Sequence, residues 1–390
     1  MAEWIECKIC DIGTVVGGAT PSTKKAENYE CGNIAWITPK DLSTFNGRYI
    51  QRGERNITEI GLKSCSTQLL PKNTVLFSSR APIGYIAIAA NQVCTNQGFK
   101  SVIPNEATDP LFLFYLLKYN KDKIEAMGSG TTFKEVSGNT MKNIIVRVPS
   151  DKEVQKNIAS ILGTLDNKIE ENERINNNLE QQAKALYKDW FFDFSPFSTK
   201  GNLPDGWHLG TVGDIIQLHD SKRVPLSGSE RDKMEKIYPY YGATSLMDYV
   251  DNYLFDGIYL LLGEDGTVVD SLGFPILQYV YGQFWVNNHA HIITGKEGFS
   301  VEELYLFFSL TNIKSIVTGA VQQKVSQQNL KKVPAIIPSK EALSAFDDLI
   351  QPIFAQIRNL RDENAHLADL RDTLLPRLMS GELDISNIEL

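Results

Sequence analysis

Cysteine is scarce in this chain and is missing from its second half. All five cysteines lie within the first hundred residues. An odd number of cysteines confined to one half of the chain argues against a disulfide framework. Cys7 and Cys10 have the spacing of zinc ligands, but no second Cys-x-x-Cys pair accompanies them. Reduced thiols on a strand are therefore favoured over a metal site.

Long apolar runs are also missing, and the first residues do not have the pattern of a leader sequence. No run of 18 or more apolar residues occurs, which argues against a membrane span. The N-terminus lacks a basic start followed by an apolar stretch, which argues against a secretory signal peptide. The hydrophobic content of 42% is ordinary for a globular protein. We therefore expect a cytoplasmic protein of two or three domains with no membrane partner.

Signatures of common enzyme classes are absent as well. There is no G-x-x-x-x-G-K-[ST] pattern, and no G-x-G-x-x-G follows a predicted strand, so a P-loop or Rossmann-type site is not indicated. The chain has no Asn-Pro-Pro-Tyr, and Ser78 and Ser79 lie outside any G-x-S-x-G context. Acidic residues are scattered without a recognisable nuclease grouping. These absences favour a binding protein over an enzyme.

Positive charge is in short supply. The formal net charge is −8, which argues against a nucleic-acid partner unless basic groups gather locally. Residues 1–150 carry a net +4, whereas residues 151–200, 201–339 and 340–390 carry −2, −5 and −5. A DNA-binding role therefore requires local basic surfaces or basic partner subunits.

What the sequence does contain is a long internal repeat. The segment 130–150 has a second copy at 319–339, in which GTTFKEVS matches GAVQQKVS and VPS matches IPS at a constant offset of 189 residues. A long helical pattern follows each copy. This period indicates a duplicated domain, because solenoid repeats are only about 20–50 residues long.

The first copy of the domain reads as a strand-rich α+β unit with one late helix. Asp109 and Pro110 are suited to open that helix, which we expect to end near 128–130. β-branched and aromatic runs predict strands at 34–38, 74–77, 84–90, 100–103 and 144–148.

The second copy follows the same order. A capping box at 300–303 predicts the start of a helix that we expect to end at Gly319. His289 and His291 alternate on one predicted strand and could suit a metal, but packing is favoured because no neighbouring carboxylates accompany them in the sequence. Strands are predicted at 257–262, 276–280 and 284–287.

Two helical segments complete the pattern, and both carry apolar residues at alternating steps of four and three, which is a heptad seam. We expect the two helices to form an intramolecular antiparallel coiled coil, with packing on their own domains as the alternative. Asn176 and Asn364 fall at equivalent seam positions, where asparagine can fix register. Pro352 should break or kink the second helix near Gln351. The seam consists of Ile158, Leu162, Leu165, Ile169, Asn176, Leu179, Phe346, Ile350, Ile353, Ile357, Leu360, Asn364 and Leu367.

Taken together, these features resemble the specificity (S) subunit of type I restriction–modification systems over essentially the full length. The resemblance is carried by WITPKDL at 36–42, VLFSSRAPIG at 75–84 and TNQG at 95–98, together with ASILGTLDNKI at 159–169, LYKDWFFDF at 186–194 and LRDTLLPRLMSGEL at 370–383. It implies target-recognition domains at 1–150 and 197–339, a central helical spacer at 151–196 and a C-terminal one at 340–390.

The resemblance also implies a function without catalysis. Each recognition domain would read half of a bipartite double-stranded DNA site, and the two helices would set the gap between the halves. Two methyltransferase subunits and motor-nuclease restriction subunits would be the protein partners. No cofactor is expected on this chain; S-adenosylmethionine would bind the methyltransferase, and ATP and magnesium the motor-nuclease. An enzyme with an unrecognised site and a structural coiled-coil protein remain the alternatives.

Candidate DNA-binding residues lie on turns at matching places in the two domains. Arg80 could pair with guanine or a phosphate, or be an ordinary surface arginine. Glu264 could accept from a cytosine amino group, whereas Asp265 better suits a structural turn. Because one turn is basic and the other acidic, we expect an asymmetric site. The amides Asn96, Gln97, Asn287 and Asn288 could pair with adenine or close loops.

The remaining candidates are expected to contact the DNA backbone or to lie beside the reading turns. They are Lys40, Arg48, Ser79, Thr131, Lys134, Lys222, Arg223, Gln322, Gln323 and Lys324.

Overall fold

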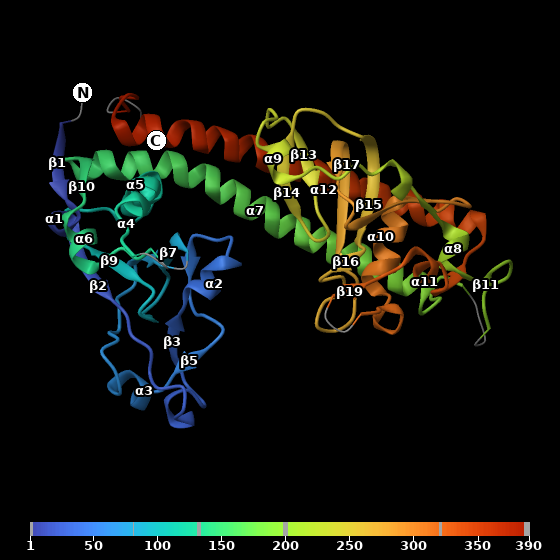
Figure 1. Cartoon of the computed structure of the whole chain (residues 1–390), viewed down its shortest axis with the longest axis horizontal. Coiled ribbons are helices and arrows are strands. Elements are labelled where there is room, and N and C mark those ends of the chain that lie inside the picture. Colours follow the sequence, from blue (N-terminus) through green and yellow to red (C-terminus); the bar gives the residue numbers. More distant parts are fainter. Residues whose placement is uncertain (1–2, 81, 131–133, 198–201, 320–321, 386–390) are drawn as a thin grey trace. The chain divides into compact units, whose positions relative to one another are not determined.

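The computed structural model describes residues 3–80, 82–130, 134–197, 202–319 and 322–385, so the candidate Thr131 lies outside the described residues. The chain divides into two compact units. Unit 1 contains residues 1–172 and 362–390, and unit 2 contains residues 173–361. None of the helices within the described ranges combines the length and apolar character that a membrane crossing requires. Figure 1 shows both units and labels many of their elements.

Unit 1 is built on a sheet with strand order β2-β9-β6-β7-β4 and a smaller sheet of order β5-β3-β8, and β1 pairs with β10. The strands are β1 (Trp4–Lys8), β2 (Gly13–Gly17), β3 (Ile34–Ile37), β4 (Tyr49–Ile50), β5 (Asn56–Ile57), β6 (Val75–Ser79), β7 (Ile83–Ala89), β8 (Cys94–Thr95), β9 (Lys100–Pro104) and β10 (Ile145–Pro149). The helices are α1 (Ile9–Ile12), α2 (Pro39–Ser43), α3 (Glu59–Lys63), α4 (Pro110–Tyr119), α5 (Lys121–Ala126) and α6 (Gly138–Asn143), with a 3-10 turn η1 (Ala26–Asn28).

Unit 2 has a sheet of order β12-β18-β15-β17-β13-β14 and two pairs, β11 with β20 and β16 with β19. The strands are β11 (His208–Thr211), β12 (Ile216–Leu218), β13 (Tyr238–Tyr241), β14 (Leu246–Val250), β15 (Phe255–Gly263), β16 (Asp265–Gly266), β17 (Leu277–Val286), β18 (Ala290–Gly295), β19 (Gln323–Lys324) and β20 (Pro334–Ile337). The helices are α8 (Val212–Ile215), α9 (Gly228–Arg231), α10 (Val301–Leu310) and α11 (Gln327–Lys331), with 3-10 turns η2 (Asp220–Lys222) and η3 (Lys314–Ile316).

The two units repeat one topology, as the sequence repeat predicts. The order β2-β9-β6-β7 in unit 1 matches β12-β18-β15-β17 in unit 2. The pairing of β1 with β10 matches that of β11 with β20, and α4 matches α10. The predicted α+β class, with two similar strand-rich domains and two long helices, is therefore confirmed.

The long helices are α7 (Lys152–Phe191) and α12 (Lys340–Ser380), which pack antiparallel within each unit (Figure 1). In unit 1, Asp166 bonds to Arg371 at 2.8 Å, and six residues further along α7 Asn172 donates to Asn364 Oδ1 at 2.9 Å. In unit 2, the rings of Phe191 and Phe346 lie 4.8 Å apart. The intramolecular pairing expected from the heptads is present inside both units.

Every residue of the predicted seam is buried or half-buried. The ends of the helices also pack on the domain cores: Ile158 and Leu162 join the core of unit 1, and Phe346 and Ile350 that of unit 2. Pairing between the helices and packing on the domains thus occur together, although the sequence presented them as alternatives. Ile353 packs half-buried against the core of unit 2, and its neighbour Phe354 is only 1% exposed.

Asn364 on α12 pairs with Asn172 on α7 and not with its repeat equivalent Asn176. Asn172 is fully buried and is the partner of Asn364, whose own amide reaches the carbonyl oxygen of Ile169 at 3.3 Å. Asn176 is the repeat equivalent of Asn364, but equivalent positions in an antiparallel pair do not face each other. The polar pair that can fix the register of the helices in unit 1 is therefore Asn172–Asn364.

Pro352 does not break α12, which continues as one helix from Lys340 to Ser380. Its side chain is exposed, so water can satisfy the Asp348 carbonyl group that loses its helical donor. Two other boundaries were also wrong. Asn120 separates α4 from α5, and α10 ends at Leu310, well before Gly319.

One predicted strand break is also absent. The segments expected at 276–280 and 284–287 form the single strand β17, which passes through Gly282. Gly282 has a φ of 78° and lies opposite Gly257, whose φ is 128°. Glycine adopts such angles without steric cost, so a pair of facing glycines lets both strands deform together.

Candidate nucleic-acid interface

Each domain has one turn that we predict to contact bases, here called the reading turn, which contains Arg80 in unit 1 and Glu264 and Asp265 in unit 2. Backbone hydrogen bonds establish which residues of the two turns are equivalent. In unit 1, Ser79 donates its N–H to Gly98 O (2.7 Å), and Val136 donates to Ser79 O (3.0 Å). In unit 2, Glu264 donates to His289 O and Val325 donates to Glu264 O, both at 2.8 Å. Ser79 thus corresponds to Glu264, and Arg80 corresponds to Asp265.

The strand pairing supports the same register. Arg80 forms an isolated bridge with Glu135, and Asp265 pairs with Lys324 in the β16–β19 ladder. Glu135 and Lys324 are also 189 residues apart, which is the offset of the sequence repeat. At this edge of each domain the reading turn therefore lies beside the repeated loop, which places two groups of candidates together.

In unit 1 this edge carries a small ion-pair cluster centred on Glu135. Arg80 Nη1 lies 3.5 Å from one carboxylate oxygen of Glu135, and Lys100 Nζ lies 3.2 Å from the other. Lys100 is also 3.4 Å from the Ser79 hydroxyl group. Arg80 remains 36% exposed, so part of its guanidinium can still reach a ligand.

In unit 2 the charges are exchanged, because Asp265 lies at the position of Arg80 and Lys324 at the position of Glu135. Glu264 accepts from Arg223 Nη1 at 2.6 Å and lies 3.4 Å from Lys324 Nζ. Glu264 is only 15% exposed and Arg223 13%, so their charges are largely used inside the domain. Lys324 is 52% exposed and stays available to a partner. The structure thus brings together Arg223, Glu264 and Lys324, three candidates distant in the sequence.

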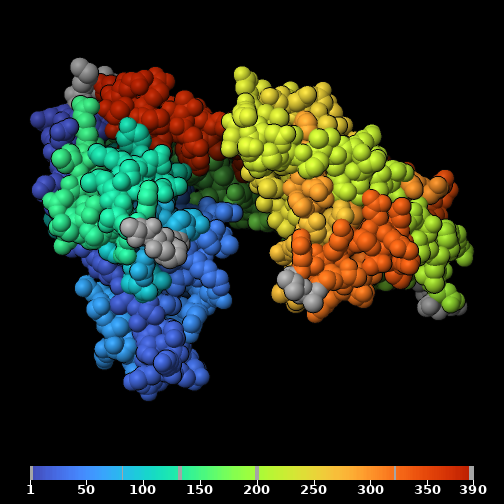
Figure 2. Space-filling view, viewed as in Figure 1, coloured from blue at the N-terminus to red at the C-terminus, as the bar shows by residue number. Residues whose placement is uncertain are grey.

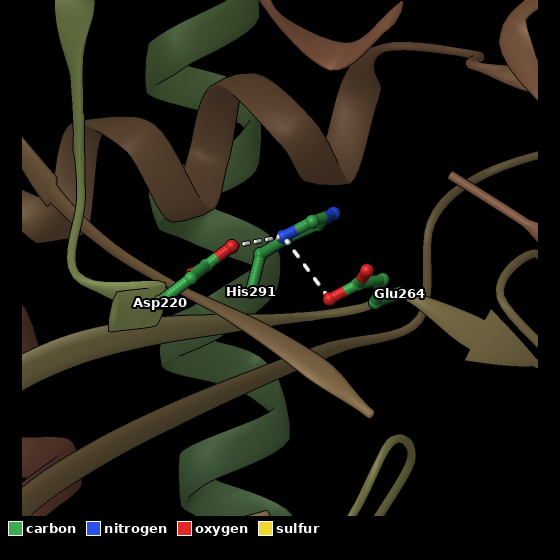
Figure 3. Close-up of side chains that lie close together, drawn as sticks. All are labelled: Asp220, Glu264 and His291. Carbon is green, nitrogen blue, oxygen red and sulfur yellow. Dashed lines mark hydrogen bonds and ion pairs between the residues drawn. The ribbon is translucent and has the colours of Figure 1, made fainter. Parts of the chain in front are cut away.

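The buried side chain of His291 also belongs to this cluster. Figure 3 shows Asp220 and Glu264 on two sides of His291, with both carboxylates directed at its Nδ1, at 2.6 and 3.7 Å. His291 Nε2 lies 2.8 Å from the carbonyl oxygen of Val325. Both ring nitrogens of His291 thus lie within hydrogen-bond distance of an oxygen atom. Burial opposes the charge of Asp220, but His291 and the Ile292 N–H outweigh it and lower the pKa of Asp220.

The same three side chains have the composition of a metal site, with ligand atoms within 4.8 Å of one another. Arg223 and Lys324 already supply positive charge to Glu264, and Arg223 also lies 3.7 Å from Asp220. The cluster is thus an ion-pair network neutralised by side chains. The sequence showed no carboxylates near His289 and His291, because Asp220, Glu264 and Asp265 reach these histidines only in the folded domain.

The candidate asparagines have the same local role in both domains. Asn96 Oδ1 accepts from the N–H of Gly98, and Asn287 Oδ1 accepts from the N–H of His289, both at 2.8 Å. The side chain of Asn287 is buried, so the loop-closing alternative describes it. Exposed neighbours are Gln97 and Asn288, which remain candidates for base contacts.

Arg48 and Ser79 are placed inside unit 1 and cannot reach DNA in this structure. Arg48 is 6% exposed and bonds to Glu170 and Gly163 O on α7, and also contacts Asn167. Ser79 is fully buried and donates to Gly98 O at 3.1 Å. The sequence suggested contact with DNA because both residues lie near surface turns. In the structure Arg48 instead links the recognition domain to α7.

Replacing Arg48 by alanine should therefore destabilise unit 1 by about 2 kcal/mol, because Glu170 loses its buried partner but can be partly hydrated. Urea unfolding of the full chain measures this loss. Lys40→Ala is the control, since the Lys40–Glu54 pair is exposed (79% and 67%) and its loss should leave the urea midpoint nearly unchanged. Unchanged stability combined with a shallower salt dependence of DNA binding would show that Arg48 contacts phosphate instead.

The other candidates lie at the surface of their domains. Figure 2 shows part of this surface, with the segment around 322–331 in orange on unit 2. Sequence reasoning missed Lys100, Glu135 and Asp220, which complete the clusters, and it considered His289 only as a possible metal ligand. Aligning the two repeats by their turns could have identified Lys100 and Glu135. The exposed or half-exposed candidates are Lys40, Lys134, Lys222, Gln322, Gln323 and Lys324.

Comparisons with known proteins agree with the duplicated architecture. The family model described as "Type I restriction modification DNA specificity domain" matches residues 1–181 and 204–365, once for each half of the chain. The MjaIX specificity subunit of a type I restriction enzyme from Methanocaldococcus jannaschii is 34% identical over 99% of this chain and 95% of its own length. The EcoprrI specificity subunit from Escherichia coli is 23% identical over 90% of this chain and 89% of its own.

A solved structure shares the fold. The S subunit of a type I restriction–modification system from M. genitalium superposes with a TM-score of 0.59 at 18% identity, covering 97% of this chain and 96% of that one. The two-domain repeat, the matched family model and the full-length relative lead to one conclusion. The chain belongs to the type I restriction–modification DNA specificity family, whose members recognise DNA sequences as specificity subunits.

Proposed function

We propose that this chain reads an asymmetric, bipartite site in double-stranded DNA, one half with each recognition domain, and performs no catalysis itself. The observation that supports this most directly is that both domains contain the same pairing of a reading turn with the repeated loop. The turn after β6 meets the repeated loop in unit 1 as the turn after β15 does in unit 2, but Arg80 is replaced by Asp265 and Glu135 by Lys324.

The exchange of charge supports two different half-sites. Arginine suits the O6 and N7 acceptors of guanine, whereas a carboxylate suits the amino group of cytosine. Domains that present opposite charges at the same position should therefore prefer different bases. A palindromic site would require the two halves to be read alike.

Contacts to phosphates would come from exposed cations near these edges. Lys134 and Lys324 occupy the repeated loop, and Lys222 follows β12. Such contacts position a protein on DNA without reading sequence. Because the net charge of the chain is −8, much of the phosphate binding would come from partner subunits.

Those partners would be two methyltransferase subunits, joined by motor-nuclease subunits for restriction, in the cytoplasm. S-adenosylmethionine would bind the methyltransferases, and ATP and magnesium the motor-nuclease. Both α7 and α12 pass from one unit of the chain into the other. Their fixed lengths would set the unread gap between the half-sites.

Co-expression with the methyltransferase subunit of the same system tests the proposal. Mapping of methylated bases in host DNA should reveal one asymmetric motif of two short half-sites separated by a gap. Exchanging residues 1–150 for the equivalent domain of another family member should change one half-site and leave the other. Methylation of a palindromic or undivided motif would contradict the proposal, as would its complete absence. Cells that express the methyltransferase alone provide the control.

A further inference from the structure

The register of the two domains draws attention to His289, which the sequence suggested only as a possible metal ligand. Gly98 in unit 1 corresponds to His289 in unit 2, since the carbonyl groups of the two residues accept from the equivalent N–H groups of Ser79 and Glu264. At the position of Arg80, unit 2 has Asp265. His289 Nδ1 lies 2.6 Å from Asp265 Oδ1. A His–Asp pair thus stands where unit 1 has a glycine and an arginine.

The backbone of His289 is fixed on both sides. Its N–H donates to Asn287 Oδ1 and its carbonyl oxygen accepts from Glu264, both at 2.8 Å. The Asp265 carboxylate then holds the ring itself. A side chain restrained at the backbone and at one ring nitrogen loses little further conformational entropy when it binds a ligand.

Other polar groups of the cluster are committed to internal contacts. His291 is fully buried and uses both ring nitrogens, and Glu264 is held by Arg223 and Lys324. His289 is 47% exposed, and among the described residues its Nε2 has no hydrogen-bond partner. Its neighbour Lys324 is 52% exposed and can hold a phosphate next to the same edge.

The bond to Asp265 decides what Nε2 can recognise. An ionised carboxylate accepts only, so the proton of the neutral ring resides on Nδ1. Nε2 is then an acceptor. In the major groove the exocyclic amino groups of adenine (N6) and cytosine (N4) are the donors that such an acceptor can read, whereas guanine and thymine offer only acceptors there.

We propose that His289, oriented by Asp265, reads the amino group of an adenine or cytosine in the half-site of the second recognition domain. His289 is a specificity-determining residue and Asp265 a positioning residue. This inference rests on the proposed function, because it requires that unit 2 reads one half of a bipartite site.

The test uses the complex of the full chain with its methyltransferase subunit. Binding is measured at one salt concentration to duplexes in which each base pair of the methylated motif is changed in turn. Wild-type complex should strongly prefer A or C at one position of one half-site, and the panel identifies which. His289→Ala should reduce that single preference by about 5- to 150-fold and leave the other half-site unchanged. Asp265→Asn should reduce it less, since the ring remains but its tautomer is no longer fixed.

His208→Ala is the matched control, because His208 is an exposed histidine of the same unit on β11, outside the cluster. It should bind every duplex as wild type does. Equal weakening of His289→Ala on all duplexes with a shallower salt dependence would identify a phosphate contact and overturn the proposal. Unaltered preferences in both His289→Ala and Asp265→Asn would overturn it too. If wild type itself reads no bipartite motif, the proposed function fails, which is a distinguishable result.

Discussion

Replacing Glu303 by glutamine should stabilise unit 2 by about 3 kcal/mol at pH 8 and by less than about 1 kcal/mol at pH 5. Glu303 lies in the first turn of α10, fully buried, where one carboxylate oxygen accepts from the N–H of Ser300 at 2.8 Å. Its other oxygen has no hydrogen-bond partner among the residues that the structure describes. Burial raises the pKa of this carboxyl group from 4.5 to about 8.

The direction of the effect follows from proton binding. Between pH 4.5 and 8 the unfolded chain has lost the proton of Glu303, while the folded protein retains it. The folded state binds more protons there, so its stability is fully present below pH 4.5 and is lost as the pH rises through 8. Glutamine resembles the neutral carboxyl group and cannot ionise, so the variant should escape this loss.

Urea unfolding of the full chain at pH 5 and pH 8, followed by tryptophan fluorescence, measures the difference. Glu230→Gln is the matched control, because Glu230 occupies the same capping-box position in α9 but is exposed. That variant should gain no stability at pH 8. A parallel pH dependence of wild type and Glu303→Gln would show that Glu303 is ionised in the folded protein.

Replacing Arg358 by alanine should destabilise unit 2 by about 3–5 kcal/mol, the largest loss that we expect from a single substitution here. Arg358 on α12 donates to Glu302 at 3.0 Å, and Glu302 is 3% exposed. Glu302 also accepts from the Tyr279 hydroxyl group at 2.6 Å and from Gln351 at 3.2 Å. Without Arg358 a buried carboxylate is left with no positive partner, which is the costly way to break a buried pair.

The double variant Arg358→Met with Glu302→Gln separates the cost of an unpaired charge from the loss of packing. It removes both charges and should recover most of the stability in urea unfolding. Lys340→Ala serves as the control, since the Lys340–Glu297 pair is exposed (77% and 66%) and should change stability by less than about 1 kcal/mol. If the double variant were as unstable as Arg358→Ala, packing rather than charge would explain the loss.

The Arg358 prediction concerns the attachment of a recognition domain to a long helix. Arg358 reaches from α12 to Tyr279 on β17 and to Glu302 on α10. In unit 1 the comparable fastening joins Arg48 to Glu170 on α7. These two ion pairs attach each recognition domain to a long helix, so their loss should lower DNA affinity as well as stability.

Much of the fold could be predicted because its determinants are local or periodic. The Asp109 and Ser300 caps begin α4 and α10 as their side chains require. Heptad spacing predicted the pairing of α7 with α12, because the burial of an apolar stripe needs a partner stripe. The ends of α4 and α10 were misjudged, since glycine permits a helix end but does not determine where it falls.

The candidate site was predicted less well, and the reason is physical. A sequence indicates which side chains can bond to DNA but not which ones are already committed to partners inside the protein. Glu264, Arg223 and Asn287 are chemically suited to base contacts, yet their folded neighbours use that capacity. His289 was considered only as a metal ligand, yet within the described part of the chain its Nε2 has no hydrogen-bond partner.

The sequence by itself determined the duplication, the α+β class, the two seam helices and the family, because repetition, periodicity and motif order survive without coordinates. Only the tertiary structure decided which polar groups face outward. Asp220, Glu264 and His291 meet across 71 residues of chain, and the buried charge that they share is balanced by Arg223 and Lys324. Burial makes such balancing obligatory, since an unpaired charge away from water is too costly to keep.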